Sequence, residues 1–160
     1  MLVLLEGLAM CLWLLLVCVT GIANGPVGLV VLYEKDVRER AVQLGLITRE
    51  KLRRRFVVVS AALFAPMVVL PPLMVYGLNG AMGFWDGAWQ MSWILWIQGI
   101  FDRLFIDWFW VGRTRAWIIP GTEDLRPYIP VKVRIMKWVF TIFGCPLIAA
   151  ALAGIVSLFL

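Results

Sequence analysis

Several kinds of chemistry are excluded by what this chain lacks. It contains no histidine, which excludes a Ser-His-Asp triad, a histidine-ligated haem and most zinc sites. Its three cysteines, Cys11, Cys18 and Cys145, form no CxxC pair, and we expect them to behave as small buried hydrophobic residues. A Gly-rich phosphate loop with its lysine is also absent. We therefore expect no metal and no cofactor, and we assign no catalytic residue.

Charged residues are scarce, and long apolar runs take their place. Only 16% of the 160 residues are charged and 62% are hydrophobic, with a mean hydropathy of +0.91, whereas a soluble domain is about 25% charged. A helix that crosses a membrane needs about 20 mostly apolar residues. The sequence therefore predicts an all-α integral membrane protein, a four-transmembrane-helix bundle that forms a single domain. The predicted helices span residues 2–33, 56–77, 88–112 and 138–160.

Basic residues gather in two short stretches between the apolar runs. Eight of the fifteen lie in residues 34–55, six lie in residues 113–137, and only Arg103 lies elsewhere. Positive charge collects in cytoplasmic loops, so the pattern predicts that these two stretches are cytoplasmic and that both termini lie outside. The expected partners are anionic lipids at the cytoplasmic face of the plasma (inner) membrane, and no nucleic acid. Candidates for binding a headgroup or another anion are Arg113, Arg115 and Arg126.

The first apolar run is too long for a signal peptide and for a straight span. It contains no positive charge, so we expect no cleaved signal peptide. Its 32 residues would extend about 48 Å as one helix, and the natural bend is Asn24-Gly25-Pro26. Gly21 and Gly25 form a GxxxG pair, and Ala149 with Ala153 forms a small face on the fourth run. Such residues allow helices to approach closely, which predicts a homo-oligomer.

The third apolar run holds the charged residues that lie deepest in the predicted membrane. Measured from Arg113, Asp102 lies about 16 Å into the helix and Asp107 about 9 Å. Arg103 and Asp107 are four residues apart and can pair along the helix, which lowers the cost of burying them. Asp102 has only Gln98 beside it on its own face. It would therefore need a donor from another helix, a cation or a proton.

Aromatic residues surround this polar centre. Six of the nine tryptophans lie between residues 85 and 110. Asn24, at the predicted bend, is expected to meet the same centre. Candidates to line a ligand site on the face of Arg103 are Trp89, Ser92, Trp96 and Trp110. Two interpretations remain open, because Asp102 and Arg103 can form either a structural polar clamp or a functional site.

Ionisable residues inside a membrane favour a function, and three hypotheses follow. The first is a small oligomeric transporter or channel-like protein, with its polar centre on the third helix and a small molecule or ion as substrate. The alternative is a non-catalytic membrane module that binds a lipid, a small ligand or a partner protein through the tryptophan-rich third helix. The third is a lipid-modifying membrane enzyme, which would use the basic loop for the headgroup.

Overall fold

A computed structural model describes residues 1–159, and all regular elements in that range are helical. In chain order they are α1 (Leu2–Ile22), η1 (Pro26–Leu32), α2 (Lys35–Gln43), α3 (Arg49–Pro72), η2 (Leu73–Leu78), α4 (Gly83–Phe101), η3 (Asp102–Val111), η4 (Glu123–Leu125), α5 (Val131–Val139), η5 (Phe140–Gly144) and α6 (Cys145–Ser157). The elements η2, η3 and η5 are π-helical, and they extend α3, α4 and α5 without a break.

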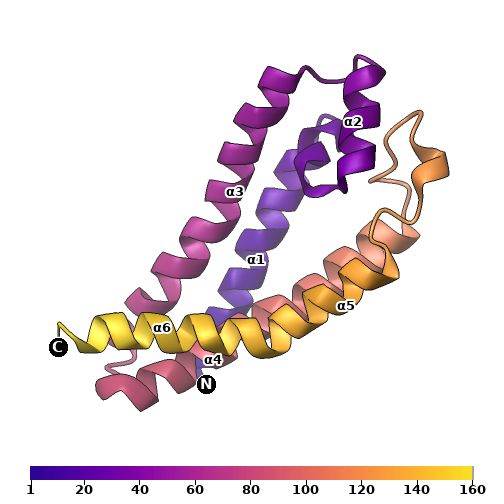
Figure 1. The fold of residues 1–160 in the computed structure, drawn as a ribbon. Coiled ribbons are helices and arrows are strands. Elements are labelled where there is room, and N and C mark those ends of the chain that lie inside the picture. The colour runs from indigo at the N-terminus through magenta and orange to yellow at the C-terminus, as the bar shows by residue number, and fades with distance from the viewer. Residues whose placement is uncertain (160) are drawn as a thin grey trace.

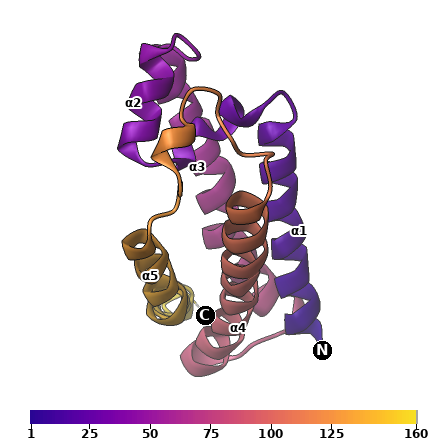
Figure 2. The ribbon, with the colours of Figure 1, turned by 90° about the vertical axis from the view of Figure 1, so that its right-hand side faces the viewer.

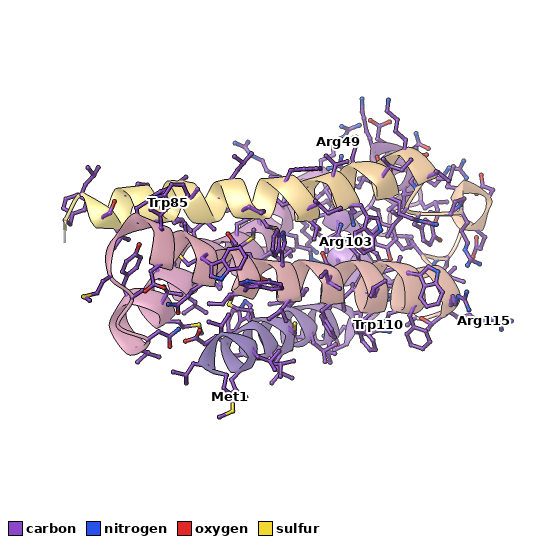
Figure 3. All side chains as sticks on the ribbon, turned by 90° about the horizontal axis from the view of Figure 1, so that it is seen from below. Met1, Arg49, Trp85, Arg103, Trp110 and Arg115 are labelled. Atoms are coloured by element: carbon purple, nitrogen blue, oxygen red, sulfur yellow. The ribbon has the colours of Figure 1, made fainter. Side chains whose placement is uncertain are left out.

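Consecutive elements join into long continuous helices, which we call rods. Three rods are long and apolar enough to cross a membrane, which supports the prediction of an all-helical membrane protein. They are Leu2–Ile22, Arg49–Leu78 and Val131–Ser157. The fourth rod, α4 with η3, is more polar because it contains two glutamines and four charged residues. It lies between α1 and the rod of α5 and α6, and it packs against both α1 and α6 (Figure 3).

The first helix ends eleven residues earlier than predicted, because the expected bend is a full reversal of the chain. Gly25 has a φ of 101°, which L-residues with a side chain rarely adopt, and Pro26 begins the 3₁₀ segment η1. The chain folds back so closely that a Cβ on Gly28 would collide with the backbone oxygen of Gly21. Gly28 therefore allows the close approach to Gly21, and a Cβ on Gly21 would itself collide with the side chain of Leu29.

Two other helices begin inside the predicted basic loops. The hydroxyl of Thr48 caps the first of these helices by accepting a hydrogen bond from the backbone N–H of Lys51 at 3.3 Å. Helix α3 therefore starts at Arg49, seven residues before the predicted span. Helix α5 starts directly after Pro130, at Val131, because proline is well suited to precede a helix but not to continue one. The basic residues of both stretches thus extend the helical rods.

Two prolines inside the rods each leave a backbone carbonyl without its usual helical donor. The indole N–H of a tryptophan from a neighbouring helix donates to each of these carbonyls instead. Pro66 has no N–H to donate to the carbonyl of Ala62, and the indole N–H of Trp13 donates to that oxygen at 2.9 Å. Pro146 likewise leaves the carbonyl of Ile142, which accepts the indole N–H of Trp96 at 3.3 Å. These bonds join α1 to α3 and α4 to η5, and they supply the partners that prolines in a membrane helix require.

The two ends of the molecule differ. Helix α2 and the second basic stretch lie together at one end, and the N-terminus lies at the opposite end (Figures 1 and 2). Helices α3 and α5 diverge toward the end that carries α2 (Figure 1). At the other end α6 packs on α4, where Ala149 and Ala153 are fully buried. These two alanines, which supported the prediction of a homo-oligomer, are thus covered within one chain.

Candidate functional site

A cavity of about 260 Å³ lies between α1, α3, η3 and α5, on the side where the molecule carries α2. We call it the central cavity. Its wall is apolar toward α1 and α3 and charged toward η3 and α5. Its lining residues are Leu14, Cys18, Leu32, Tyr33, Leu63, Asp102, Arg103, Ile106, Asp107, Val111, Trp117, Tyr128, Ile129 and Lys137.

Three of the predicted site residues meet in this cavity, and Lys137 joins them. The Nη1 atom of Arg103 lies 3.1 Å from Oδ2 of Asp107, so the predicted pairing along the helix is confirmed. The Nζ atom of Lys137 lies 2.9 and 3.0 Å from the two carboxylate oxygens of Asp107. Figure 3 shows Arg103 on the side of its helix that faces the rod of α5. We call Asp102, Arg103, Asp107 and Lys137 the polar network.

Asp102 has a partner that the helical wheel did not indicate. Its carboxylate contacts the Nη2 atom of Arg103, the next residue in the chain. An ideal α-helix would turn the two side chains about 100° apart. The segment η3 is π-helical, with hydrogen bonds from i to i+5, so each residue turns less and neighbouring side chains point in closer directions. Arg103 therefore bridges both aspartates.

The polar network balances its own charge. It contains two carboxylates and two basic groups, and the side chains of Arg103 and Asp107 are each only 10% exposed. Asp102 and Lys137 are more open to the cavity, at 26% and 36%. Breaking a buried ion pair by removing one partner costs about 3–5 kcal/mol, because the other charge stays buried. The network therefore suits both the structural and the functional interpretation.

Aromatic residues close the cavity on the side of α2. The hydroxyl of Tyr33 donates to the backbone oxygen of Trp117 at 2.5 Å, and the ring of Tyr128 packs edge-on against Tyr33 with centroids 5.0 Å apart. The hydroxyls of Tyr128 and Thr122 lie 2.9 Å apart. Burial, with a smaller contribution from Tyr128, raises the pKa of Tyr33. Tyr33 is therefore a neutral donor near physiological pH.

A second hollow adjoins the central cavity and is more basic. It measures about 310 Å³ and shares Asp107 and Tyr128 with the cavity. Arg126 and Arg134 also line it, and both are exposed. Neither arginine forms an ion pair within residues 1–159. The combined space therefore carries a positive charge, since the polar network is balanced and these two arginines are not.

The tryptophans and the serine predicted to line a site have other surroundings. Trp89 is exposed and packs edge-on against Trp93, and Trp96 donates to Ile142 as described above. Trp110 packs edge-on against the cavity residue Trp117, with centroids 5.3 Å apart. The hydroxyl of Ser92 donates to the backbone oxygen of Ala88 at 2.6 Å. Of these residues only Trp110 contacts the cavity lining, through Trp117, and Trp110 does not itself line the cavity.

The remaining predicted residues divide in the same way. Gln98 lies one turn before Asp102, half-buried and outside the cavity lining. Asn24 is exposed in the turn after α1 and does not line the central cavity. The guanidinium of Arg113 lies 4.1 Å from the ring centre of Trp108, and Arg115 is exposed. Of the three predicted anion candidates, Arg126 lines the second hollow, which adjoins the central cavity.

A second polar cluster lies at the other end of the same rod. The amide of Asn79 donates to Glu6 Oε2 at 3.0 Å and to Gln90 Oε1 at 2.9 Å, and Gln90 donates to Asp86 at 2.9 Å. Glu6 is only 7% exposed. The bonds tie α1 to α4 and to the turn after η2. Glu6 and Asn79 are 73 residues apart in the sequence, so only the folded chain brings them together.

Lys137 is the site residue that sequence reasoning missed. It was counted as the end of the second basic loop, at the predicted membrane surface. The signal that could have found it is depth, since Lys137 is six residues after the start of α5 and Asp107 is four residues before the end of η3. Two antiparallel helices joined at that end place such residues at similar heights. A prediction that α5 starts at Val131 would have placed Lys137 inside this helix and near the depth of Asp107.

The central cavity and the second hollow combine apolar walls with charged side chains. Within residues 1–159 no group of three or more histidine, cysteine, aspartate or glutamate residues could hold a metal ion. Comparison with protein-family models, with curated proteins and with solved structures finds no match. The function is therefore argued from the site itself.

Proposed function

We propose that this membrane protein binds an anionic amphiphile, a lipid-like molecule with a phosphate headgroup, in the central cavity and the adjoining hollow. The observation that carries the proposal is that one wall of this space is apolar and that the wall next to it carries positive charge. Leu14 and Leu63 supply an apolar wall, and Arg126 and Arg134 supply unpaired positive charge next to it. An apolar body and an anionic group on one ligand would match these two walls.

The size of the space and its position support a ligand of this kind. The two hollows measure about 260 and 310 Å³, and small-molecule sites usually measure about 300–1,000 Å³. The cavity is bounded by Leu63 of α3 on one side and by Lys137 of α5 on the other. Because α3 and α5 diverge at this level (Figure 1), a ligand could enter sideways from the bilayer.

The proposal includes four membrane crossings with both termini outside. The rod of α4 and η3 has 29 residues, which at 1.5 Å per residue is about 43 Å and long enough for a bilayer. It packs between two rods that are apolar enough to span, so it would cross beside them. Both basic stretches lie at one end of the molecule, as expected if that end is cytoplasmic.

Transport is the second candidate, because the polar network places charged side chains on the wall of a cavity between the rods. Between the polar network and the Glu6 cluster, the same rod carries the buried residues Met91, Ile94 and Leu95. Transport would require this apolar layer to open, whereas binding would not. A homo-oligomer remains part of this second candidate, and exposed apolar faces on α3 and α6 would have to supply the interface.

Binding is tested with the full chain in nanodiscs of zwitterionic lipid, titrated with a short-chain phosphatidic acid and read by native mass spectrometry. The variant Arg126→Gln/Arg134→Gln should bind at least tenfold more weakly, because each charge-assisted hydrogen bond contributes about 1.5–3 kcal/mol. The control Arg115→Gln/Lys132→Gln removes the same charge from exposed residues outside the two hollows. Equal weakening in both variants would reject the cavity as the site.

The two candidates are separated by flux. Liposomes that contain the wild-type protein would be loaded with the same labelled phosphatidic acid. A transporter should release it, and Asp102→Asn should stop the release while the variant still folds. Binding without flux in the wild type would remove transport and leave the binding proposal in place.

A further inference from the structure

A separate basic hollow lies where α2 meets the start of α3, outside the central cavity. It measures about 320 Å³, and we call it the α2–α3 hollow. It shares no lining residue with the central cavity or with the hollow next to it. Its lining residues are Val31, Arg38, Arg49, Leu52, Arg53 and Phe56.

Three arginines from two helices converge on this hollow without acidic partners. Arg38 comes from α2, and Arg49 and Arg53 come from the first two turns of α3. None of the three forms an ion pair within the described part of the chain. The Nε atom of Arg38 is buried and has no hydrogen-bond partner there. A buried donor without an acceptor is costly, so the site favours an anion that brings one.

The start of α3 adds to this preference. Arg49 is the first residue of the helix, and the first backbone N–H groups of a helix carry partial positive charge and lack helical partners. Thr48 satisfies one of them, the N–H of Lys51. A phosphate near Arg49 would therefore meet guanidinium groups and the positive end of the helix together.

The remaining wall is apolar and lies at the membrane boundary. Val31, Leu52 and Phe56 complete the lining, and Phe56 is the first residue of the long apolar part of α3, directly after the last arginine. The hollow thus lies where the charged turns of α3 give way to its membrane-spanning part. A soluble anion would leave the apolar wall unused, whereas a phospholipid would place its phosphate on the arginines and its chain along Phe56.

We infer that the α2–α3 hollow binds the phosphate of an anionic phospholipid from the leaflet that meets the basic loops. This inference is independent of the ligand in the central cavity, because the residues differ. It predicts a site with defined residues, in contrast to the diffuse attraction that any basic loop has for an anionic surface. The three arginines are the recognition group, and Phe56 contacts the lipid chain.

The test compares two triple variants of the full chain with equal loss of charge. Arg38→Gln/Arg49→Gln/Arg53→Gln removes the recognition group. Lys51→Gln/Arg54→Gln/Lys132→Gln removes three exposed charges that do not line the hollow. Each protein is extracted from phosphatidylcholine vesicles that contain a minor fraction of phosphatidylglycerol, and retained lipid is counted by native mass spectrometry. The hollow variant should retain at least tenfold less phosphatidylglycerol, and the control should match the wild type.

The outcomes separate this inference from the others. Equal loss in both triple variants would mean diffuse attraction and would overturn the site. Displacement of phosphatidylglycerol by inorganic phosphate alone, at millimolar concentration, would overturn the lipid assignment. Melting temperature and helical circular dichroism of each variant, compared with the wild type, serve as the folding control. Short-chain phosphatidic acid carries the same kind of phosphate and would be bound by both sites, so it is not used for this purpose.

Discussion

Arg103 occupies the position on which the polar network depends. It is the only basic residue outside the two basic stretches, and its side chain contacts both Asp102 and Asp107. Asp107 also holds Lys137, so one carboxylate on η3 binds a cation from its own rod and one from α5. A buried arginine suits this position because its planar group can serve two carboxylates at once and stays charged.

At the residue scale we predict that the two aspartates differ in importance for stability. Asp107→Asn leaves Arg103 and Lys137 without their shared carboxylate and should lower the free energy of unfolding by about 3–5 kcal/mol. Asp102→Asn should cost less than half of this, because Asp102 has one partner and is more exposed. Titration of each variant with a denaturing detergent in mixed micelles measures its free energy of unfolding. Equal losses would contradict the central role of Asp107.

At the element scale, the rods are shaped by the places where regular helix is interrupted. Glycine and proline end α1 after Ile22, and α4 passes into the π-helical segment η3 at Asp102. Proline inside α3 and α6 removes backbone donors, and Trp13 and Trp96 replace them from other helices. These tryptophans therefore contribute to the packing of the rods through their N–H groups as well as through their area.

We predict that Trp13 and Pro66 are energetically coupled. Trp13→Phe should lower the free energy of unfolding by about 1 kcal/mol, the size of a hydrogen bond between membrane helices. In a Pro66→Ala background residue 66 regains an N–H that can serve the carbonyl of Ala62, so the same change should cost less. A double-mutant cycle in micelles measures the difference. Additive effects would mean that the indole does not replace the missing donor.

At the scale of the whole molecule, the number of rods that cross the membrane decides on which side each terminus lies. Three rods pass the test of length and hydropathy, and three crossings would place the two termini on opposite sides. Four crossings would place them on the same side. The parity of the crossings is therefore a direct test of the proposed topology, and it does not depend on any ligand.

We predict that both termini lie outside. An alkaline phosphatase fused after Leu160 should be active, because this reporter folds only outside the cytoplasm, and a green fluorescent protein at the same place should be dark. Reporters inserted at Gly45, in the turn between α2 and α3, should show the reverse. A fluorescent C-terminal fusion together with an outside N-terminus would mean three crossings and would reject the four-helix topology.

The sequence by itself determined the features that depend on neighbouring residues. Apolar runs of sufficient length predicted an all-helical membrane protein, and the spacing of Arg103 and Asp107 predicted their pairing along one helix. Residues 24–26 indicated a bend, which the structure shows as a turn after Ile22. Each of these follows from local backbone geometry and hydropathy, which are properties of a short stretch of chain.

Only the tertiary structure decided which distant residues share a site. Lys137 reaches Asp107 from another rod, and Tyr33 and Trp117 meet across 84 positions of sequence. Asn24, predicted to join the polar centre, is exposed instead, because it lies in the turn where the chain reverses. Such contacts depend on where each helix begins, how it is rotated and which helix lies beside it. Hydropathy carries little information on rotation, since lipid and protein core are both apolar.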